Sequence, residues 1–572
     1  MTTARLTTSD ELDDTVTVLA DHKTEWARLD YPSRLALLAE LRRRVGAAAP
    51  DWVDAAVRPK GIAADGRTAA EEWLSGPYTT LTAIAALHRS IARLWQGDTT
   101  FDPGWVSAGP KGRTVVTAVP VSLQDKLLFS GYTGEVWIGP EQADTPLQEQ
   151  TAAFYRGRDG PGRVCVVLGA GNMSSIPVLD TLYKMFVEGQ VVVLKMSPVL
   201  DHLGGILETM LQPLLAAGYL RIAYGGTEVG GLLTGHSGVD TIHITGSRRS
   251  HDAIVFGPGE EGSRRRVANT PVMTKPVSSE LGGVSPLIVV PGPWRRADLA
   301  HHAELVATSK LLNGGFNCIS TQVLILSDRW EHTDDFLRRI EETIAGMAPR
   351  PAYYPGAAGR MARAMASHHD VVPLGGDPPR AHLRHIPAGS HHQVFDEEVF
   401  APVLASTRLE HGDPADFLAA AVHFANHCLD GTLGANLLIH PETATRLGNR
   451  FTGAVTDLRY GCVAINTWTG FGFAQPRLPW GGYQGEPSHG SGSGTGVVHN
   501  ALMFDHPEKA VVTGPFFRAR RSWRGGGLNL APRPPWFVTN ETALTTARRL
   551  TAHATDGSLR HLPGIVASAL LG

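Results

Sequence analysis

The stretch VCVVLGAGNMS, residues 164–174, decides the predicted fold. It begins with an unbroken apolar run of strand length, and a glycine-rich turn leads from that run into a predicted helix over 174–187. The alternation continues along the chain with strands over 191–195, 221–224 and 241–245, a helix over 201–217 and a short helix before Gly238. Strands that alternate with helices through short turns predict a parallel, doubly wound α/β sheet with right-handed crossovers.

The turn GAGNMS, residues 169–174, is a partial G-x-G-x-x-G motif. A complete motif would place the pyrophosphate of a dinucleotide on the helix that follows. Here Ser174 replaces the third glycine, and Lys195 ends the next strand where an acidic residue would be expected. These departures weaken the simple dinucleotide interpretation. They leave Asn172 and Lys195, on consecutive turns of one βαβ unit, as polar residues that need another explanation.

A candidate nucleophile lies further along the chain, in LLNGGFNCIS, residues 311–320. Cys318, one of four cysteines, follows a flexible Gly-Gly pair, and ELGG at 280–283 offers a carboxylate upstream. A thiolate attacks a carbonyl better than a hydroxyl does, although an isolated cysteine is more often a small buried apolar residue. The pair ELGG and G-x-x-C resembles the aldehyde dehydrogenase superfamily, and the resemblance covers about residues 105–515.

The resemblance implies a catalytic set of three residues. Cys318 would be the nucleophile, Glu280 the general base and Asn172 the side-chain amide of the oxyanion hole. The thiolate would attack an aldehyde to give a thiohemiacetal, a hydride would pass to NAD or NADP, and Glu280 would activate water to hydrolyse the thioester. The implied reaction is therefore NAD(P)-dependent oxidation of an aldehyde to a carboxylate.

The same resemblance implies a cofactor site. Its residues would be Lys195, Ser197 and Pro198 after one strand, Thr245, Gly246 and Ser247 of the turn ITGS, and Glu398 and Phe400 of EEVFAPV at 397–403. NAD-preferring relatives commonly carry a glutamate at the position of Pro198, where its charge would repel a 2′-phosphate. The ammonium of Lys195 and the hydroxyl of Ser197 suit that phosphate instead. We therefore expect both cofactors to be used, with NADP at least as good as NAD.

Aromatic residues mark the expected substrate side. Trp468, Phe471 and Phe473 cluster in the loop that the resemblance places at the substrate entrance. Aromatic lining suggests a medium-sized apolar or aromatic aldehyde, although aromatic residues also serve as ordinary packing.

The fold implied is α/β with two doubly wound domains and a small oligomerisation arm. We expect a mostly helical N-terminal part over 1–105, a dinucleotide-binding domain over 106–135 and 160–279, a catalytic domain over 280–465, bridging or oligomerisation segments over 136–159 and 480–515, and a C-terminal extension over 516–572. The residues between Ser247 and Glu280 exceed the number expected for the family, and their arginine-rich part is interpreted as a solvated surface loop. No catalytic role is assigned to the N-terminal helices, and the C-terminal extension is assigned only packing or subunit contacts.

Composition sets broad limits on the function. The chain has 572 residues, too many for one core, and a formal net charge of −3, which gives no electrostatic argument for nucleic acid or a membrane. The four cysteines are too scattered for a disulfide framework or a zinc site, and no metal is expected. No signal peptide or membrane-spanning run is evident. We expect a cytoplasmic enzyme that forms a homodimer or homotetramer and takes a small-molecule aldehyde.

Three alternatives remain open. A CoA-acylating aldehyde dehydrogenase, or acyl-CoA reductase, would share the nucleophile, but such relatives commonly lack the glutamate that Glu280 supplies. A catalytically inactive relative with a binding role is disfavoured because nucleophile, base and oxyanion residue are all present. A thiol-dependent hydrolase would need a histidine beside Cys318, and no obvious candidate is present.

Overall fold

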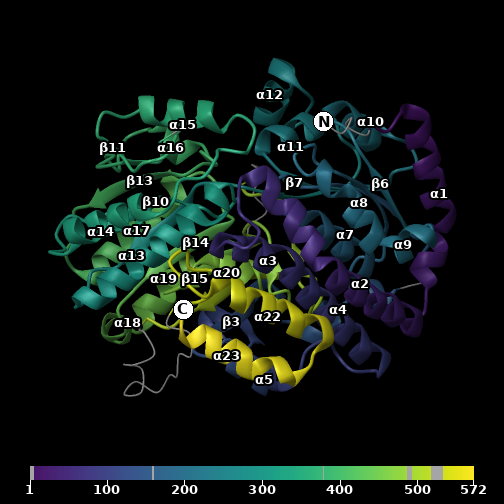
Figure 1. Cartoon of the computed structure of the whole chain (residues 1–572), viewed down its shortest axis with the longest axis horizontal. Coiled ribbons are helices and arrows are strands. Elements are labelled where there is room, and N and C mark those ends of the chain that lie inside the picture. The colour runs from purple at the N-terminus through teal and green to yellow at the C-terminus, as the bar shows by residue number, and fades with distance from the viewer. Residues whose placement is uncertain (1–5, 158–159, 378, 486–491, 517–532) are drawn as a thin grey trace.

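Two β-sheets carry the chain in the computed structural model, which describes residues 6–157, 160–377, 379–485, 492–516 and 533–572. Figure 1 shows the larger sheet and its helices in green on one side and the smaller sheet in teal on the other. Helices from the two ends of the chain, purple and yellow, meet along the lower part of the molecule.

The smaller sheet is the predicted parallel α/β unit. Its strands lie in the order β6-β5-β4-β7-β8, and every neighbouring pair is parallel. They are β4 (Val164–Leu168), β5 (Val191–Lys195), β6 (Leu220–Ala223), β7 (Thr241–Gly246) and β8 (Val277–Leu281). Strand β5 is buried throughout and β4 and β7 are buried except at their last residue, as expected for strands of a sheet covered on both faces. The strand order reverses between β4 and β7, and doubly wound sheets bind ligands at the carboxyl ends of the strands at such a reversal.

The larger sheet has eleven strands in the order β1-β2-β3-β18-β15-β14-β9-β10-β13-β12-β11. They are β1 (Val106–Ala108), β2 (Thr114–Val119), β3 (Thr133–Ile138), β9 (Ser285–Val289), β10 (Thr321–Ser327), β11 (Val371–Pro373), β12 (Ala381–Leu383), β13 (Val403–Leu409), β14 (Gly434–Leu438), β15 (Cys462–Ile465) and β18 (Pro507–Thr513). The strands from β18 to β12 are parallel, and antiparallel strands extend both edges. A short hairpin joins β16 (Pro479–Trp480) to β17 (Val498–His499).

The position of residues 106–135 corrects the expected organisation. These residues were expected in the dinucleotide-binding domain, but β1, β2 and β3 belong to the larger sheet. The reason is the late strand β18, which pairs in parallel with β15 on one side and antiparallel with β3 on the other. A pairing between segments more than 350 residues apart leaves no local signal in the sequence.

Helices surround the two sheets. Those of the N-terminal and smaller-sheet parts are α1 (Ser9–Arg28), α2 (Tyr31–Val57), α3 (Ala70–Trp73), α4 (Thr79–Trp95), α5 (Leu123–Leu128), α6 (Ala153–Arg156), α7 (Ile176–Phe186), α8 (Gly204–Met210), α9 (Gln212–Ala216), α10 (Thr227–Gly235), α11 (Arg248–Val255) and α12 (Gly259–Val267). Those around the larger sheet are α13 (Arg296–Leu311), α14 (Thr333–Gly346), α15 (Ala357–Ala366), α16 (Gln393–Asp396), α17 (Pro414–Cys428), α18 (Pro441–Leu447), α19 (Asn449–Asp457) and α20 (Thr469–Phe473). None of the helices in the described parts of the chain is both long and apolar enough to cross a bilayer.

Two local expectations differ from the structure. The helix expected over 201–217 is interrupted at Leu211, because Pro213 cannot donate the backbone hydrogen bond that would continue it. The segment after Ser247, interpreted as a loop, instead forms α11 and α12. Acidic residues in the first turn of α12 and the arginines 264–266 in its last turn suit the helix dipole, and this pattern explains its formation.

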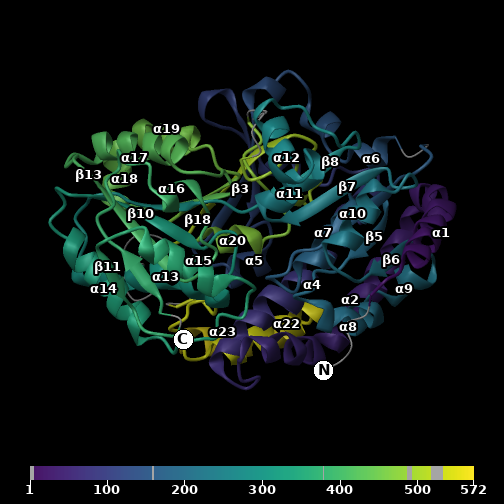
Figure 2. The same ribbon diagram turned by 90° about the horizontal axis from the view of Figure 1, so that it is seen from above.

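The two ends of the chain pack against each other. The C-terminal helices α22 (Ala543–Asp556) and α23 (Leu562–Leu570) lie beside the N-terminal helices, as Figure 2 shows from above. The contact is close, because a Cβ on Gly46 of α2 would come within 2.1 Å of the Thr555 methyl group. Arg42 also donates through Nε to the Ala554 carbonyl at 2.8 Å. The extension is thus an integral part of the fold.

Candidate active site

The turn that carries Cys318 needs its glycines. After α13 the chain makes a short 3-10 turn in which Asn313, Gly314 and Gly315 all have positive φ angles, 54°, 67° and 83°. A Cβ on Gly315 would come within 2.8 Å of the Pro402 backbone nitrogen, so only glycine fits there. This tight turn presents the partly exposed thiol of Cys318 to a cavity before β10 begins.

Glu280 faces the thiol from the other sheet. It stands near the end of β8, is 3% exposed, and its Oε1 has no hydrogen-bond partner among the described residues. Burial and then the negative charge of Asp180 raise the pKa of Glu280 to about 7. Burial and then the charge of Glu280 raise the pKa of the Cys318 thiol. The pair therefore consists of a neutral thiol beside a carboxyl group that titrates near neutral pH.

A second carboxyl group approaches the same place. The Glu398 side chain packs against Gly282, where a Cβ would come within 2.1 Å of a Glu398 carboxylate oxygen. Burial and then the charge of Glu280 raise the pKa of Glu398 to about 8, although the cations Lys310, Arg360 and Arg248 oppose that shift. Gly282, two residues after Glu280, therefore leaves the space through which the Glu398 side chain reaches the site.

Asn172, the residue predicted for the oxyanion hole, lies next to the turn that carries Cys318. It is 6% exposed, and its Nδ2 donates to the Phe316 carbonyl at 3.2 Å, two residues before Cys318. A side-chain amide has two N–H donors, so this bond leaves one donor for an oxygen at the reacting carbon.

A buried polar network, missed from the sequence, holds this arrangement. Lys60 donates to Glu72 at 2.5 Å, to the Asn313 side chain at 2.8 Å and to the Asn172 carbonyl at 3.4 Å. Glu71 accepts from the Asn313 backbone N–H at 2.8 Å. Burial is the largest influence on the pKa of Lys60 and lowers it, but the charges of Glu72, Tyr353 and Glu71 and the hydrogen bond to Glu72 together outweigh burial and raise the pKa. The N-terminal region, given no catalytic role above, therefore fixes both sides of the catalytic turn.

The rest of the network closes around the same turn. The Tyr353 hydroxyl donates to the Asn313 side chain at 3.1 Å and to the Asn172 carbonyl at 3.3 Å. Arg350 pairs with Glu71. Lys60 lies 112 residues from Asn172 and 253 from Asn313 in the chain, so no motif or spacing could have identified these contacts.

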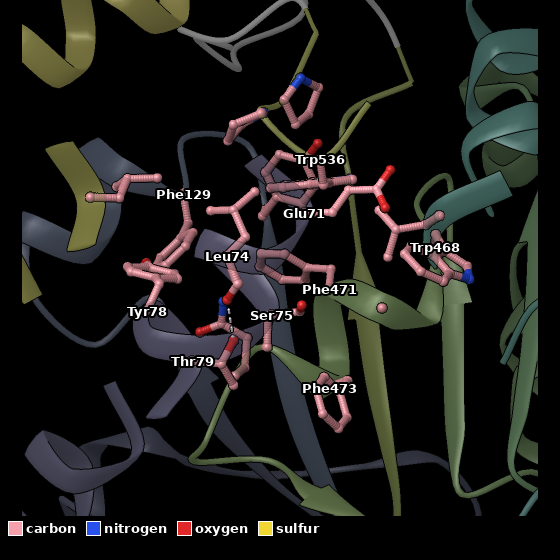
Figure 3. Close-up of a pocket in the computed structure, with 18 of the residues that line it drawn as sticks. Glu71, Leu74, Ser75, Tyr78, Thr79, Phe129, Trp468, Phe471, Phe473 and Trp536 are labelled. Atoms are coloured by element: carbon pink, nitrogen blue, oxygen red, sulfur yellow. Dashed lines mark hydrogen bonds between the residues drawn. The ribbon is translucent and has the colours of Figure 1, made fainter. Parts of the chain in front are cut away.

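The cavity in front of Cys318 contains the three predicted substrate residues. Trp468, Phe471 and Phe473 line it, and Figure 3 shows their rings around a common space with residues 71–79 and Trp536. Trp468 also donates through Nε1 to the Ile319 carbonyl at 3.0 Å and so fixes the residue after the cysteine. The sequence did not predict that residues from both ends of the chain would share this wall.

The predicted cofactor residues other than Glu398 and Phe400 lie at the carboxyl ends of β5 and β7, on either side of β4. Lys195 is largely buried, which lowers its pKa, and no carboxylate among the described residues lies within ion-pair distance of it. Ser247 caps α11 by accepting from the Ser250 backbone N–H. Thr245 differs from expectation, because its hydroxyl donates inward to Asp180 at 2.7 Å and leaves only its backbone for a ligand.

This edge of the smaller sheet, at the carboxyl ends of β5 and β7, has groups that suit a dinucleotide. It offers a lysine ammonium, the Ser197 hydroxyl and the backbone N–H groups that begin α11, which are donors for ribose and phosphate oxygens. A Cβ on Gly171 would come within 2.6 Å of Ser197 Oγ, so the glycine at this position in the turn after β4 leaves room for that hydroxyl. Further along, Glu398 and Phe400 border the catalytic pair, where the reactive end of such a cofactor would have to lie.

Comparisons with known proteins agree with this geometry. Residues 138–353 match the model of the aldehyde dehydrogenase family. An N-succinylglutamate 5-semialdehyde dehydrogenase of Caulobacter vibrioides is 27% identical over 452 residues, which are 74% of this chain and 86% of that protein. The structure of an aldehyde dehydrogenase C mutant from Pseudomonas syringae, complexed with NAD+ and octanal, gives a TM-score of 0.59 at 16% identity over 88% of both chains.

A further structural neighbour carries the other nicotinamide cofactor. The NADP-dependent glyceraldehyde-3-phosphate dehydrogenase of Bacillus halodurans, complexed with NADP, gives a TM-score of 0.58 at 18% identity over 89% of this chain and 92% of that one. The family match and the named dehydrogenase relatives support an oxidoreductase that acts on aldehydes. Together with the structural neighbours, they support the aldehyde dehydrogenase superfamily for this chain.

The raised pKa of Glu280 predicts a pH-dependent stability. A carboxyl group whose pKa is 4.5 when exposed and about 7 in the folded chain favours folding in its protonated form, so the penalty grows between these values and is complete above pH 7. We expect Glu280→Gln to raise the free energy of unfolding by up to about 3 kcal/mol at pH 8.5 and by much less at pH 5.5. Denaturant melts at both pH values measure this, with the exposed Glu149→Gln as the control. An equal effect at both pH values would contradict the assigned pKa.

The Lys60 network predicts a coupled loss of stability and reactivity. Lys60→Met leaves the Glu72 carboxylate buried without its cation, which typically costs about 3–5 kcal/mol. Replacing both partners, in Lys60→Met with Glu72→Leu, should restore part of that stability but not the anchoring of Asn313. We therefore expect the double variant to fold yet to react more slowly with iodoacetamide at Cys318.

The matched control for this experiment is Lys111→Met, which removes an exposed ion pair with Asp457 and should change neither quantity measurably. If the double variant kept the wild-type alkylation rate at Cys318, the network would have only a structural role.

Proposed function

We propose that the chain oxidises an aldehyde to a carboxylate with NAD or NADP through a thioester on Cys318. The observation that supports this most strongly is the contact between the Cys318 thiol and a carboxyl group that titrates near neutrality, beside a free amide donor of Asn172. None of the described residues that line the cavity is a histidine, so the alternative of a Cys-His hydrolase has no base at hand.

The first step needs a thiolate. In its ionised form Glu280 takes the Cys318 proton, and the sulfur attacks the aldehyde carbon to form a C–S bond. The carbonyl oxygen becomes an oxyanion that the remaining Asn172 N–H and the Cys318 backbone N–H stabilise. One such donor is worth about 10²–10³ in rate.

The second stage removes a hydride and then adds water. When bound, the nicotinamide accepts the hydride, and Lys195, Ser197, Glu398 and Phe400 are the residues that would hold the cofactor. Collapse of the oxyanion leaves a thioester on Cys318. Glu280 passes the thiol proton to solvent and, ionised again, takes a proton from a water whose oxygen attacks the thioester carbon. The C–S bond then breaks, the Cys318 sulfur takes that proton from Glu280, and the acid product leaves as the carboxylate after losing a proton to solvent. The acyl group could instead pass to CoA, but the presence of Glu280 next to Cys318 favours water.

The relative's named substrate is not carried over to this chain. N-succinylglutamate 5-semialdehyde bears carboxylates, and the described residues that line the cavity before Cys318 include no lysine, arginine or histidine. A buried carboxylate without a cation or hydrogen-bond donors is strongly unfavourable.

The reaction is tested with an aldehyde panel, NAD+ or NADP+, and the variant Cys318→Ala. We expect wild-type protein to reduce the cofactor without CoA, and Cys318→Ala to lose at least about tenfold in turnover while its nucleotide affinity stays within a few fold, because the thiol contacts the aldehyde only. Cys428→Ala, which removes the exposed cysteine at the end of α17, is the control and should remain active. Turnover that required CoA, or that survived in Cys318→Ala, would refute the proposal.

The cofactor preference is tested at Pro198, an exposed residue after β5. We expect kcat/KM with NADP+ to be at least equal to that with NAD+ in the wild type. In Pro198→Glu the carboxylate should repel a 2′-phosphate and lower kcat/KM for NADP+ by about tenfold or more, close to 1.4 kcal/mol. A wild type that favours NAD+ more than about tenfold, or a variant with unchanged NADP+ efficiency, would contradict this expectation.

A further inference from the structure

Both ends of the chain close the cavity in front of Cys318. The N-terminal side contributes Leu74 and Tyr78, and the C-terminal extension contributes Trp536, Leu550 of α22 and Val566 of α23. Figure 3 shows Trp536 facing Phe471 across the same space as Leu74 and Tyr78, and the rings of Phe471 and Trp536 are 5.9 Å apart. The extension, to which sequence analysis assigned only packing or subunit contacts, is thus part of the wall that a substrate of Cys318 would contact.

The wall of this cavity is mostly apolar, and none of the described residues that line it is cationic. Glu71 is the one charged residue among the described residues that line it, and its carboxylate is already held by Arg350 and by the Asn313 backbone N–H. The Thr79 hydroxyl donates to the Leu74 carbonyl. The polar groups that could bind a charged substrate are therefore either engaged within the protein or lack a positive charge.

We propose that the substrate is a bulky, uncharged aldehyde whose apolar body lies between the two ends of the chain, with the C-terminal helices selecting it by contact. This inference rests on the proposed aldehyde oxidation at Cys318. Each methylene removed from water strengthens binding by roughly fourfold, whereas a carboxylate at the far end of the substrate would lose its hydration without gaining a cation.

The test compares three aldehydes that differ in one property at a time. Octanal and 8-oxooctanoate have the same length but differ in a terminal carboxylate, and propanal lacks most of the apolar body. We expect kcat/KM for octanal to exceed that for each of the other two by at least about tenfold. Equal or better use of 8-oxooctanoate or propanal would overturn the inference.

A matched pair of lysine substitutions on α23 tests the wall directly. Val566 lines the cavity and Leu570, one turn further along, is 49% exposed to solvent. Val566→Lys should reverse the preference toward 8-oxooctanoate by at least about tenfold, because it brings an ammonium into reach of the carboxylate. Leu570→Lys should leave the preference unchanged. If the two variants behaved alike, α23 would not form part of the substrate wall.

A binding measurement separates this inference from the proposed reaction. Isothermal titration calorimetry of Cys318→Ala with each aldehyde should show that octanal binds at least about tenfold more tightly than 8-oxooctanoate. If octanal binds in this way but the wild type oxidises no aldehyde, the reaction is wrong and the apolar site stands. If the wild type oxidises aldehydes but Cys318→Ala binds 8-oxooctanoate as tightly as octanal, the reaction stands and the substrate class is wrong.

Discussion

The contact between the Cys318 thiol and the Glu280 carboxyl group is the interaction on which the proposed chemistry depends. Burial and then the charge of Glu280 raise the pKa of the Cys318 thiol, whereas burial and then the charge of Asp180 raise the pKa of Glu280, against the hydrogen bond with Cys318, which lowers it. The pKa of about 7 at Glu280 means that the base is half ionised near neutral pH. Such a carboxyl group can take a proton from the thiol and return it later, which is what a two-stage acyl reaction needs.

The two partners reach this contact from different sheets. Glu280 comes from the last strand of the smaller sheet, and Cys318 comes from the turn before β10 in the larger one. Relative movement of the sheets would separate them, so the arrangement needs a fixed junction. Lys60, together with Glu71 and Glu72 of α3, supplies part of this junction. These residues hold the turn at Asn313 and the Asn172 carbonyl in one buried network.

The sequence predicted the parts of the fold that follow local rules. The runs at 164–168 and 191–195 became adjacent parallel strands, and the N-terminal part expected to be mostly helical contains α1, α2 and α4. Cys318, Glu280 and Asn172 could be proposed because each stands in a short motif with a chemical reason. The place of 106–135 in the larger sheet could not, since it depends on β18, far along the chain.

The same limit applied to the site. Lys60, Glu72 and Trp536 act through partners that only the folded chain brings near, and their local sequences look like ordinary helix ends or tail. Thr245 shows the opposite error, because its motif was recognised but its hydroxyl binds Asp180 inside the protein.

The central claim is that an acyl group is carried on Cys318, and trapping that intermediate tests it most directly. In Glu280→Gln the water that should hydrolyse the thioester is no longer activated, so the acyl-enzyme should accumulate. The variant is mixed with octanal and NADP+, quenched in acid, and its peptides are weighed by mass spectrometry. An octanoyl group on the peptide that contains Cys318, formed only with the cofactor present, is the predicted result. An adduct on Cys165, Cys428 or Cys462 instead, or no adduct in either the variant or wild-type protein quenched during its first turnover, would contradict the proposed role of Cys318.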